Sequence, residues 1–285
     1  MGGVFGNNIR LSIFGESHGK AIGIVVDGLP PGIKLDLKEI EKEMMRRRPG
    51  KDQFSTGRVE KDEFEILSGY FEDKTTGTPL CAIIYNTDKK SRDYDEIRDL
   101  LRPSHGDYTG KLKYKGYNDY RGGGHFSGRI TAPVVFAGAI AKQILEEKGI
   151  QIGSHIQRIG DIEDKKFDYV DISEDLLSSL RNKEIPTIDE EKSNMMKNSI
   201  LRAKEEKDSV GGIIECAMIN VPPGLGNPFF DSVESMLSHL LFSIPGIKGV
   251  EFGDGFDISK MRGSLANDEF YIEEENIRTY TNHNG

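Results

Sequence analysis

Glycine is the feature that most constrains how this chain can fold, because 33 of its 285 residues are glycine and they come in clusters. The fraction, about 12%, exceeds the ~7% of an average protein. The glycines follow neither the triplet repeat of collagen nor the low complexity of a linker. They lie in short groups between well-patterned segments, within residues 15–19, 122–124, 211–212 and 224–226. Glycine lets a backbone adopt positive φ or approach a ligand closely, so we expect a site built from loops.

The charge balance excludes several classes of protein. The chain has 38 basic and 47 acidic residues, a net charge of −9, which argues against a nucleic-acid or anionic-membrane binder. The longest weakly polar run, residues 131–141, is about half a membrane span, and no signal peptide opens the chain. Cys81 and Cys216 lack metal-type spacing, so we expect neither a disulfide scaffold nor a metal site. A cytoplasmic protein that does not enter the membrane is predicted.

The pattern of apolar residues predicts an α+β fold. Runs rich in Ile, Val and Phe predict strands at 10–14, 22–27, 64–68, 80–85, 213–221 and 248–252. Strands follow strands across turns without a regular βαβ alternation, which favours antiparallel sheets and a sandwich of strands and helices. No repeat or linker divides the chain, so we expect one domain over residues 1–285, with the charged segment 163–207 as a peripheral helical insertion.

Helix starts are marked by capping residues. Asp36 is the expected cap of a helix that ends before Pro49. Thr131 precedes a small-residue helix that stops at Gly149. Capping-box patterns predict two more helices, one capped by Thr187 and reaching about residue 207, the other capped by Asp231 and reaching about residue 242.

Two histidines lie in turns where acid–base chemistry is plausible. His18 stands between glycines directly after a predicted strand, and His105 lies in Arg102-Pro-Ser-His-Gly-Asp107. Imidazole donates or accepts protons near neutral pH. Arg102 and His105 are close enough to face one anion, and Asp107 can orient the imidazole. The alternative is that both are ordinary surface-turn residues.

The loop Arg121-Gly-Gly-Gly-His-Phe-Ser-Gly-Arg129 is the strongest candidate for binding an anion. A glycine-rich loop that enters a helix N-terminus offers backbone N–H groups to phosphate, and Arg121 and Arg129 flank it. The loop matches neither a Walker motif nor a dinucleotide fingerprint.

A third basic group, Arg46-Arg-Arg48, ends the first predicted helix, where a solvated cluster is the ordinary interpretation. RNA contact through it or through Arg121-Gly-Gly is disfavoured by the net charge of −9. Together, the two histidines and three arginine groups indicate acid–base chemistry on a phosphorylated small molecule.

The order of the motifs gives a more specific indication. Most of the chain resembles the chorismate synthase family, through motifs that appear in family order: Phe14-Gly-Glu-Ser-His-Gly19, Val26-Asp-Gly-Leu-Pro-Pro-Gly32, Arg46-Arg-Arg-Pro-Gly50, Leu67-Ser-Gly69, Thr75-Thr-Gly-Thr-Pro79, Arg102-Pro-Ser-His-Gly-Asp-Tyr-Thr109, Asp119-Tyr-Arg-Gly-Gly-Gly124, Asp208-Ser-Val-Gly-Gly212, Gly224-Leu-Gly-Asn-Pro228 and Lys248-Gly-Val-Glu-Phe-Gly253.

The resemblance implies a lyase of aromatic amino acid biosynthesis, on the shikimate pathway. Its reaction removes phosphate and a ring hydrogen from 5-enolpyruvylshikimate 3-phosphate to give chorismate. It also implies a requirement for reduced FMN without net oxidation. A homotetramer with a β-α-β sandwich protomer is expected, supplied with reduced flavin by an external reductase, with NADPH as an indirect reductant only.

The resemblance assigns roles by matching position. His18 is the expected acid near the leaving phosphate, and His105 the residue that protonates the reduced flavin. Arg47, Arg102 and Arg129 are expected to bind the phosphate and carboxylates of the substrate. The flavin contacts are expected from His125, Phe126 and Ser127, with Pro245 and Gly246 as a second contact from a neighbouring subunit.

Three departures from the family pattern qualify these roles. Gln53 replaces a basic residue, and His-Phe-Ser-Gly-Arg stands at 125–129 where Arg-Ser-Ser-Ala-Arg is common. The sequence given stops at Gly285, where family members continue, which predicts weak FMN binding and poor turnover. The alternative functions are a non-catalytic flavin or phosphate-ester binding protein of the same fold and, less favoured, an RNA-binding protein.

Overall fold

The structure is a computed structural model that describes all residues except 1, 51–53, 55–58 and 88–99. The chain divides into two compact units, Met1–Glu147 and Lys148–Gly285, each of which is described by itself. Gln53, the expected departure in anion binding, lies outside the described residues.

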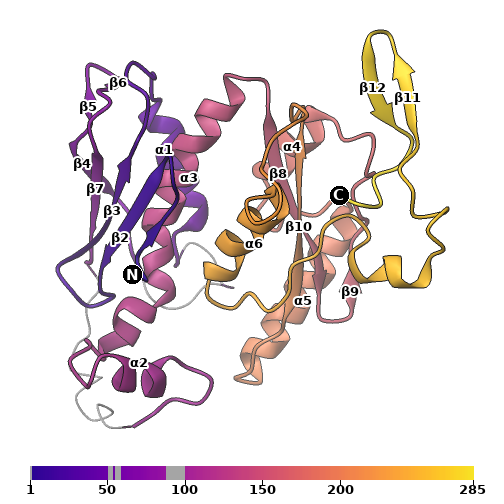
Figure 1. The fold of residues 1–285 in the computed structure, drawn as a ribbon. Coiled ribbons are helices and arrows are strands. Elements are labelled where there is room, and N and C mark those ends of the chain that lie inside the picture. Colours follow the sequence, from indigo (N-terminus) through magenta and orange to yellow (C-terminus); the bar gives the residue numbers. More distant parts are fainter. Residues whose placement is uncertain (1, 51–53, 55–58, 88–99) are drawn as a thin grey trace. The chain divides into compact units, whose positions relative to one another are not determined.

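The first unit is built on an antiparallel five-stranded sheet (Figure 1). The strand order is β1 (Val4–Phe5), β2 (Arg10–Gly15), β3 (Ala21–Asp27), β7 (Leu80–Tyr85) and β4 (Phe64–Ser68). The short strands β5 (Tyr70–Phe71) and β6 (Lys74–Thr75) form a separate pair. Alternate residues of the two central strands, such as Ile22 and Ile24 on β3 and Leu80 and Ile84 on β7, are fully buried or nearly so. This alternation gives the sheet one apolar face.

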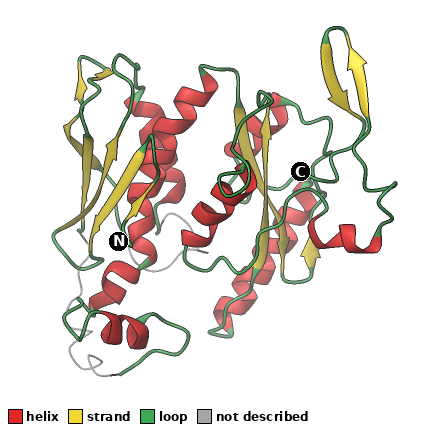
Figure 2. Ribbon diagram, viewed as in Figure 1, coloured by secondary structure: helices red, strands yellow, loops and turns green. Residues whose placement is uncertain are grey.

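Two helices cover that face, α1 (Leu37–Arg47) and α3 (Thr131–Glu146) (Figure 2). Ile40 and Met44 of α1 and Phe136 and Ile140 of α3 belong to the same buried cluster as the strand residues. Burying one such side chain contributes about 1.5–3 kcal/mol, so this cluster is the main source of stability in the first unit. A short helix, α2 (Asp107–Lys113), follows His105.

The second unit contains a smaller antiparallel sheet, in which β8 (Gln151–Ile159) lies between β10 (Gly212–Ile219) and β9 (Ile162–Glu163). The helices of this unit are α4 (Glu174–Arg181), α5 (Glu190–Glu205) and α6 (Val233–Ser243). The strands β11 (Phe270–Glu273) and β12 (Asn276–Thr279) form a hairpin.

A buried histidine that contacts two carboxylates stands in the middle of β8. His155 is 1% exposed, and its Nδ1 lies 3.0 Å from Asp164 Oδ2 and its Nε2 2.7 Å from Glu215 Oε2. Phe167 packs its ring edge-on against the imidazole. Both ring nitrogens thus have a hydrogen-bond partner, which is the condition for burying such a polar group in the second unit.

The α+β class with open antiparallel sheets is confirmed. Five predicted strands are present as β2, β3, β4, β7 and β10, but the strand expected at 248–252 is wrong, since that segment has no regular structure. The longest strand, β8, and the helices α2 and α4 were not predicted. The single domain and the insertion at 163–207, which contains α4 and α5, stay predictions.

Three of the expected helix caps are wrong. Asp36 does cap α1, accepting from the N–H groups of Lys38 and Glu39. However, Asp189 caps α5 and Ser232 caps α6, each through its own side chain, in place of Thr187 and Asp231. Thr131 is the first residue of α3, and its hydroxyl donates to Gly128 O. Within the described part of the chain, no helix combines the length and apolarity needed to cross a membrane.

Candidate active site

The glycine loop has a backbone conformation that requires glycine. Gly122, Gly123 and Gly124 have φ of +57°, +86° and +54°, all in the left-handed region. A residue with a Cβ adopts this region only at a cost, and three in succession are essentially restricted to glycine. After Ser127, a short 3-10 turn (Gly128–Ile130) leads into α3, so the loop does not enter the helix directly as expected.

This loop brings the two predicted histidines together. A Cβ on Gly122 would lie 2.2 Å from His18 Cε1, and a Cβ on Gly123 would lie 3.0 Å from His105 Nε2. The two imidazoles therefore pack against adjacent residues of one loop, although they are far apart in sequence. His18 is 7% exposed, whereas the His105 side chain is 28% exposed.

Asp107 fixes the orientation of His105. Its Oδ1 lies 2.8 Å from His105 Nδ1, and the carboxylate also accepts two hydrogen bonds from the Arg102 guanidinium, each of 2.8 Å. The hydrogen bonds from Arg102 hold the pKa of Asp107 at about 2, against burial, which raises it. The charged carboxylate stands beside Nδ1, and the other ring nitrogen, Nε2, lies beside Gly123.

The turn that carries His18 is held from two sides. Ser17 N donates to Gly124 O over 3.1 Å, which ties the turn to the glycine loop. Asn86, which follows β7, donates from Nδ2 to Glu16 O and Gly19 O, each over 3.0 Å. The residues on both sides of His18 are therefore fixed by the loop and by the end of a sheet strand.

A second carboxylate lies near His18. Asp119 accepts two hydrogen bonds from the Arg121 guanidinium, of 2.9 and 2.7 Å. These bonds are the main cause that lowers the pKa of Asp119, burial opposes them, and the charge of His18 adds a smaller lowering. Arg121 is thus engaged within its own loop.

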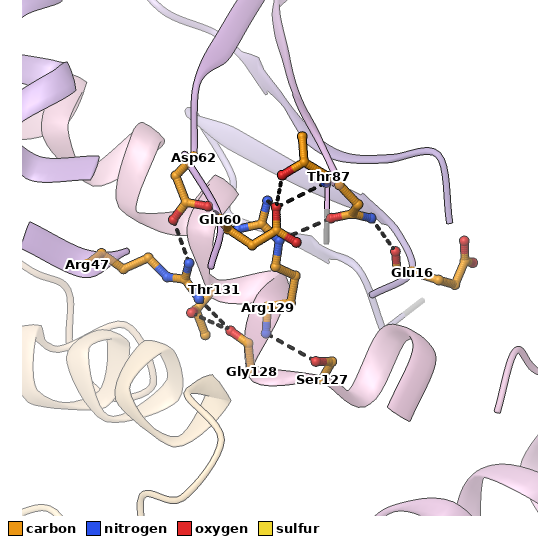
Figure 3. Close-up of polar contacts among 10 residues, drawn as sticks. Glu16, Arg47, Glu60, Asp62, Thr87, Ser127, Gly128, Arg129 and Thr131 are labelled. Atoms are coloured by element: carbon orange, nitrogen blue, oxygen red, sulfur yellow. Dashed lines mark hydrogen bonds and ion pairs between the residues drawn. The ribbon is translucent and has the colours of Figure 1, made fainter. Parts of the chain in front are cut away.

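Arg129 and Arg47 share one buried carboxylate, that of Asp62 (Figure 3). Arg47 Nη1 donates to Asp62 Oδ2 over 2.7 Å, and Arg129 Nη1 donates to Asp62 Oδ1. Arg129 Nη2 lies 3.8 Å from Glu60 Oε2, and Arg129 Nε donates to Asn86 Oδ1 over 3.0 Å. Arg129 is 4% exposed, and its Nε and Nη1 have acceptors in the protein, whereas its buried Nη2 makes no hydrogen bond to any described residue. The substrate contact expected of Arg129 stays a prediction.

The residues expected to contact a flavin have structural partners. His125 Nδ1 lies 2.9 Å from Gly15 O, and Ser127 Oγ accepts from Arg129 N. The Phe126 ring packs against Gly110 of α2, where a Cβ would lie 2.7 Å from it. Pro245 and Gly246 are exposed residues after α6 in the second unit. These flavin contacts stay predictions.

Four polar residues of the site were missed by sequence reasoning: the buried Glu60, Asp62 and Asn86, and the exposed Thr87, which donates to Glu60. Asn86 and Thr87 directly follow the apolar run of β7, and a polar pair at a strand end was the available signal. Nothing in the sequence near Asp62 indicates its two arginine partners. Among the residues that the structure describes, no group of three or more His, Cys, Asp or Glu is arranged to hold a metal ion.

Comparison with known proteins gives a consistent result. The family model described as chorismate synthase matches residues 9–285. A chorismate synthase of Thermococcus kodakarensis is 47% identical over 280 residues, covering 98% of this chain and 76% of that protein. One of Dehalococcoides mccartyi is 43% identical over 285 residues, covering 100% and 77%. A crystal structure of chorismate synthase superimposes with a TM-score of 0.78 at 31% identity, covering 97% of this chain and 78% of that one.

Proposed function

The chain belongs to the chorismate synthase family, and from this premise we propose that it removes phosphate and a ring hydrogen from 5-enolpyruvylshikimate 3-phosphate to form chorismate. The observation that supports this reaction best is the packing of His18 and His105 against adjacent glycines of one loop. An elimination that releases phosphate needs a proton at the leaving oxygen, and imidazole is the side chain best suited to supply it near neutral pH.

His18 is the proposed acid for the departing phosphate. Its 7% exposure keeps bulk water away, and its turn is fixed by Ser17 and Asn86, so the imidazole is oriented before substrate binds. A preoriented donor in a dry site stabilises developing negative charge better than one in water. The C–O bond to phosphate breaks, and the released oxygen takes the proton.

Arg47 and Arg102 are proposed to bind the anionic groups of the substrate. The Arg47 side chain is 19% exposed and that of Arg102 36%, so both guanidinium groups reach solvent while a carboxylate fixes one side of each. Forked guanidinium donors match phosphate and carboxylate oxygens.

The residues present fit a flavin. His105 is partly exposed, its Nε2 lies beside the backbone of Gly123, and Asp107 lies 2.8 Å from its Nδ1. His105 and residues 125–127 would hold reduced FMN, with Pro245 and Gly246 of a neighbouring subunit as the second contact. When bound, reduced FMN supplies electron density as phosphate leaves and recovers it without net oxidation. His105 would hold or release a proton at Nε2, the ring nitrogen that lies away from Asp107.

The assembly and supply of this enzyme are proposed from the family alone. We expect a cytoplasmic homotetramer that takes reduced flavin from an external reductase, with NADPH as an indirect reductant only. The FMN affinity and the turnover rate of the 285-residue chain are both measured by varying the FMN concentration in the phosphate-release assay described next.

The test is phosphate release from 5-enolpyruvylshikimate 3-phosphate under anaerobic conditions with reduced FMN. We expect His18→Ala and His105→Ala each to lower kcat by roughly 10²–10⁴-fold, the range for loss of a general acid. The matched control is His239→Ala, an exposed histidine on α6, which should keep the wild-type rate. Wild-type rates in either variant remove that histidine from the mechanism, and binding of substrate without phosphate release supports a non-catalytic binding protein.

A further inference from the structure

We propose that Asn86 is the positioning residue for His18, connecting its turn to the buried Arg129 guanidinium. This role deepens the proposed function and rests on it, because it assumes that His18 acts in the reaction. The side chain of Asn86 makes three hydrogen bonds of 3.0 Å, and the residue is 5% exposed.

The chemistry of its partners permits only one orientation of the Asn86 amide. A guanidinium only donates, so Arg129 Nε must face the carbonyl oxygen of the amide. The backbone carbonyls of Glu16 and Gly19 only accept, so both must face the NH₂ group. Each of the two amide protons thus has its own acceptor, and these two acceptors bracket His18 in sequence.

The other end of this connection is rigid because Arg129 is held by carboxylates. Asp62 binds Arg129 and Arg47, and Glu60 lies near Arg129 Nη2. Glu60 in turn accepts from Thr87 N and Thr87 Oγ1, over 3.1 and 2.8 Å. Two guanidinium groups and two carboxylates balance in charge, which is the condition for keeping such groups buried. The carboxylates therefore fix Arg129, and Arg129 fixes the Asn86 oxygen.

The consequence for catalysis is geometric. The His18 ring lies directly on Gly122, and its turn also bonds to Gly124 through Ser17. If the two carbonyls at Glu16 and Gly19 lose their donor, the turn shifts relative to the loop. A displacement of about 1 Å at a catalytic group can cost about 100-fold in rate. Arg129 accordingly contributes to the position of His18 through the Asn86 oxygen.

The deciding experiment compares Asn86→Asp with Gln143→Glu. In both variants the amide NH₂ group becomes a carboxylate oxygen of equal size. That oxygen then faces a backbone carbonyl oxygen, to which it cannot donate. Gln143 Nε2 donates to Asp36 O over 3.0 Å and its Oε1 accepts from Asp36 N over 2.8 Å, which connects α3 to the start of α1. It has no contact with either histidine turn, so its variant measures the general cost of this replacement.

We expect Asn86→Asp to lower kcat about 10- to 100-fold with KM within about 3-fold of wild type, whereas Gln143→Glu keeps the wild-type kcat. Backbone amide exchange at Ser17 and Gly19 should accelerate in Asn86→Asp only, and the His18 imidazole resonance should move while that of His155 does not. Arg129→Lys retains a cation for Asp62 but loses the Nε donor, and it should show the same split between kcat and KM.

Several results would overturn the proposal. They are a wild-type kcat in Asn86→Asp, equal losses in Asn86→Asp and Gln143→Glu, or a rise in KM alone in Arg129→Lys, which would make Arg129 a substrate contact. Should Asn86→Asp not fold, the wild type decides: rapid solvent exchange of both Asn86 side-chain amide protons would refute the bonds. If the wild type releases no phosphate, the proposed function fails first and this role falls with it.

Discussion

Gly122 is constrained by two independent features, its φ of +57° and the contact with the His18 ring. We predict that Gly122→Ala destabilises the protein by about 1–2 kcal/mol through backbone strain. The added methyl group, 2.2 Å from His18 Cε1 before any relaxation, must also displace the imidazole, so kcat should fall about 10- to 100-fold. Thermal denaturation and the phosphate-release assay measure the two effects separately.

Gly138 provides the control for this substitution. It lies in α3, it is exposed, and a Cβ there would meet nothing within 4 Å. Gly138→Ala should be neutral or stabilising by up to about 1 kcal/mol, with unchanged kcat. An unchanged kcat in Gly122→Ala would contradict a catalytic His18 held by this loop.

For single residues, the sequence indicated which side chains could take part in acid–base chemistry, but not which other side chains they contact. His18 could be found because it stands in a turn between glycines, and His105 because it lies in a turn between Arg102 and Asp107. Asp62 and Asn86 could not be assigned, because both contact Arg129, which lies 67 residues from Asp62 and 43 residues from Asn86 in the sequence. An arginine near a glycine loop suggests anion binding equally well whether its anion is a ligand or a buried carboxylate.

Among the elements, α1 and α3 are joined by an ion pair that responds to pH. Glu43 Oε1 lies 3.0 Å from Lys142 Nζ, and Glu43 Oε2 lies 2.6 Å from Arg46 Nη1. Burial raises the pKa of Glu43, but hydrogen bonds and charges from Lys142 and Arg46 outweigh it and lower the pKa to about 2. The contribution of Glu43 to stability is therefore complete above its ordinary pKa of 4.5 and is lost as the pH falls towards 2.

We predict that Glu43→Gln lowers the free energy of unfolding by about 1–3 kcal/mol near pH 7, and that the difference from wild type shrinks as the pH falls from about 4.5 towards 2. Denaturant titrations at several pH values measure it. Glu39→Gln on the same helix removes an exposed pair with Lys42, so it should cost less than about 0.5 kcal/mol. A difference for Glu43→Gln that persists at low pH would exclude the ionic explanation.

The elements that sequence reasoning identified are those whose apolar pattern is simple. The strands β3 and β7 are continuous apolar runs, and α1 has a capping aspartate and one apolar face. The strand β8 was missed because His155 and other polar residues interrupt its pattern, and the buried His155 is stabilised by carboxylates from Asp164 and Glu215, outside the strand. At 248–252 the error was to predict a strand from local β propensity alone, since this segment has no regular structure.

For the whole molecule, the distribution of charge bears on the class of ligand. The net charge is −9, and the arginines that looked available in the sequence are paired with carboxylates: Arg102 with Asp107, Arg121 with Asp119, and Arg129 with Asp62. In each pair the guanidinium can still direct N–H donors at a small anion, but the carboxylate balances most of its positive charge. A polyanion needs many unneutralised cations along one surface, and it gains affinity mainly by releasing counterions.

We therefore predict that a labelled single-stranded RNA binds with a Kd weaker than about 10⁻⁴ M, and that lowering the salt from about 200 to about 50 mM strengthens binding by less than about 10-fold. Fluorescence anisotropy measures both quantities, with a basic RNA-binding domain in the same buffers as the positive control. Because Arg121 donates twice to Asp119, Asp119→Asn should strengthen RNA binding more than a remote Asp168→Asn, an exposed aspartate in the second unit. Micromolar affinity with a steep salt dependence in the wild type would show that the Arg121-Gly-Gly segment acts as a cationic surface despite its carboxylate partner, and would favour RNA binding over a small phosphorylated substrate.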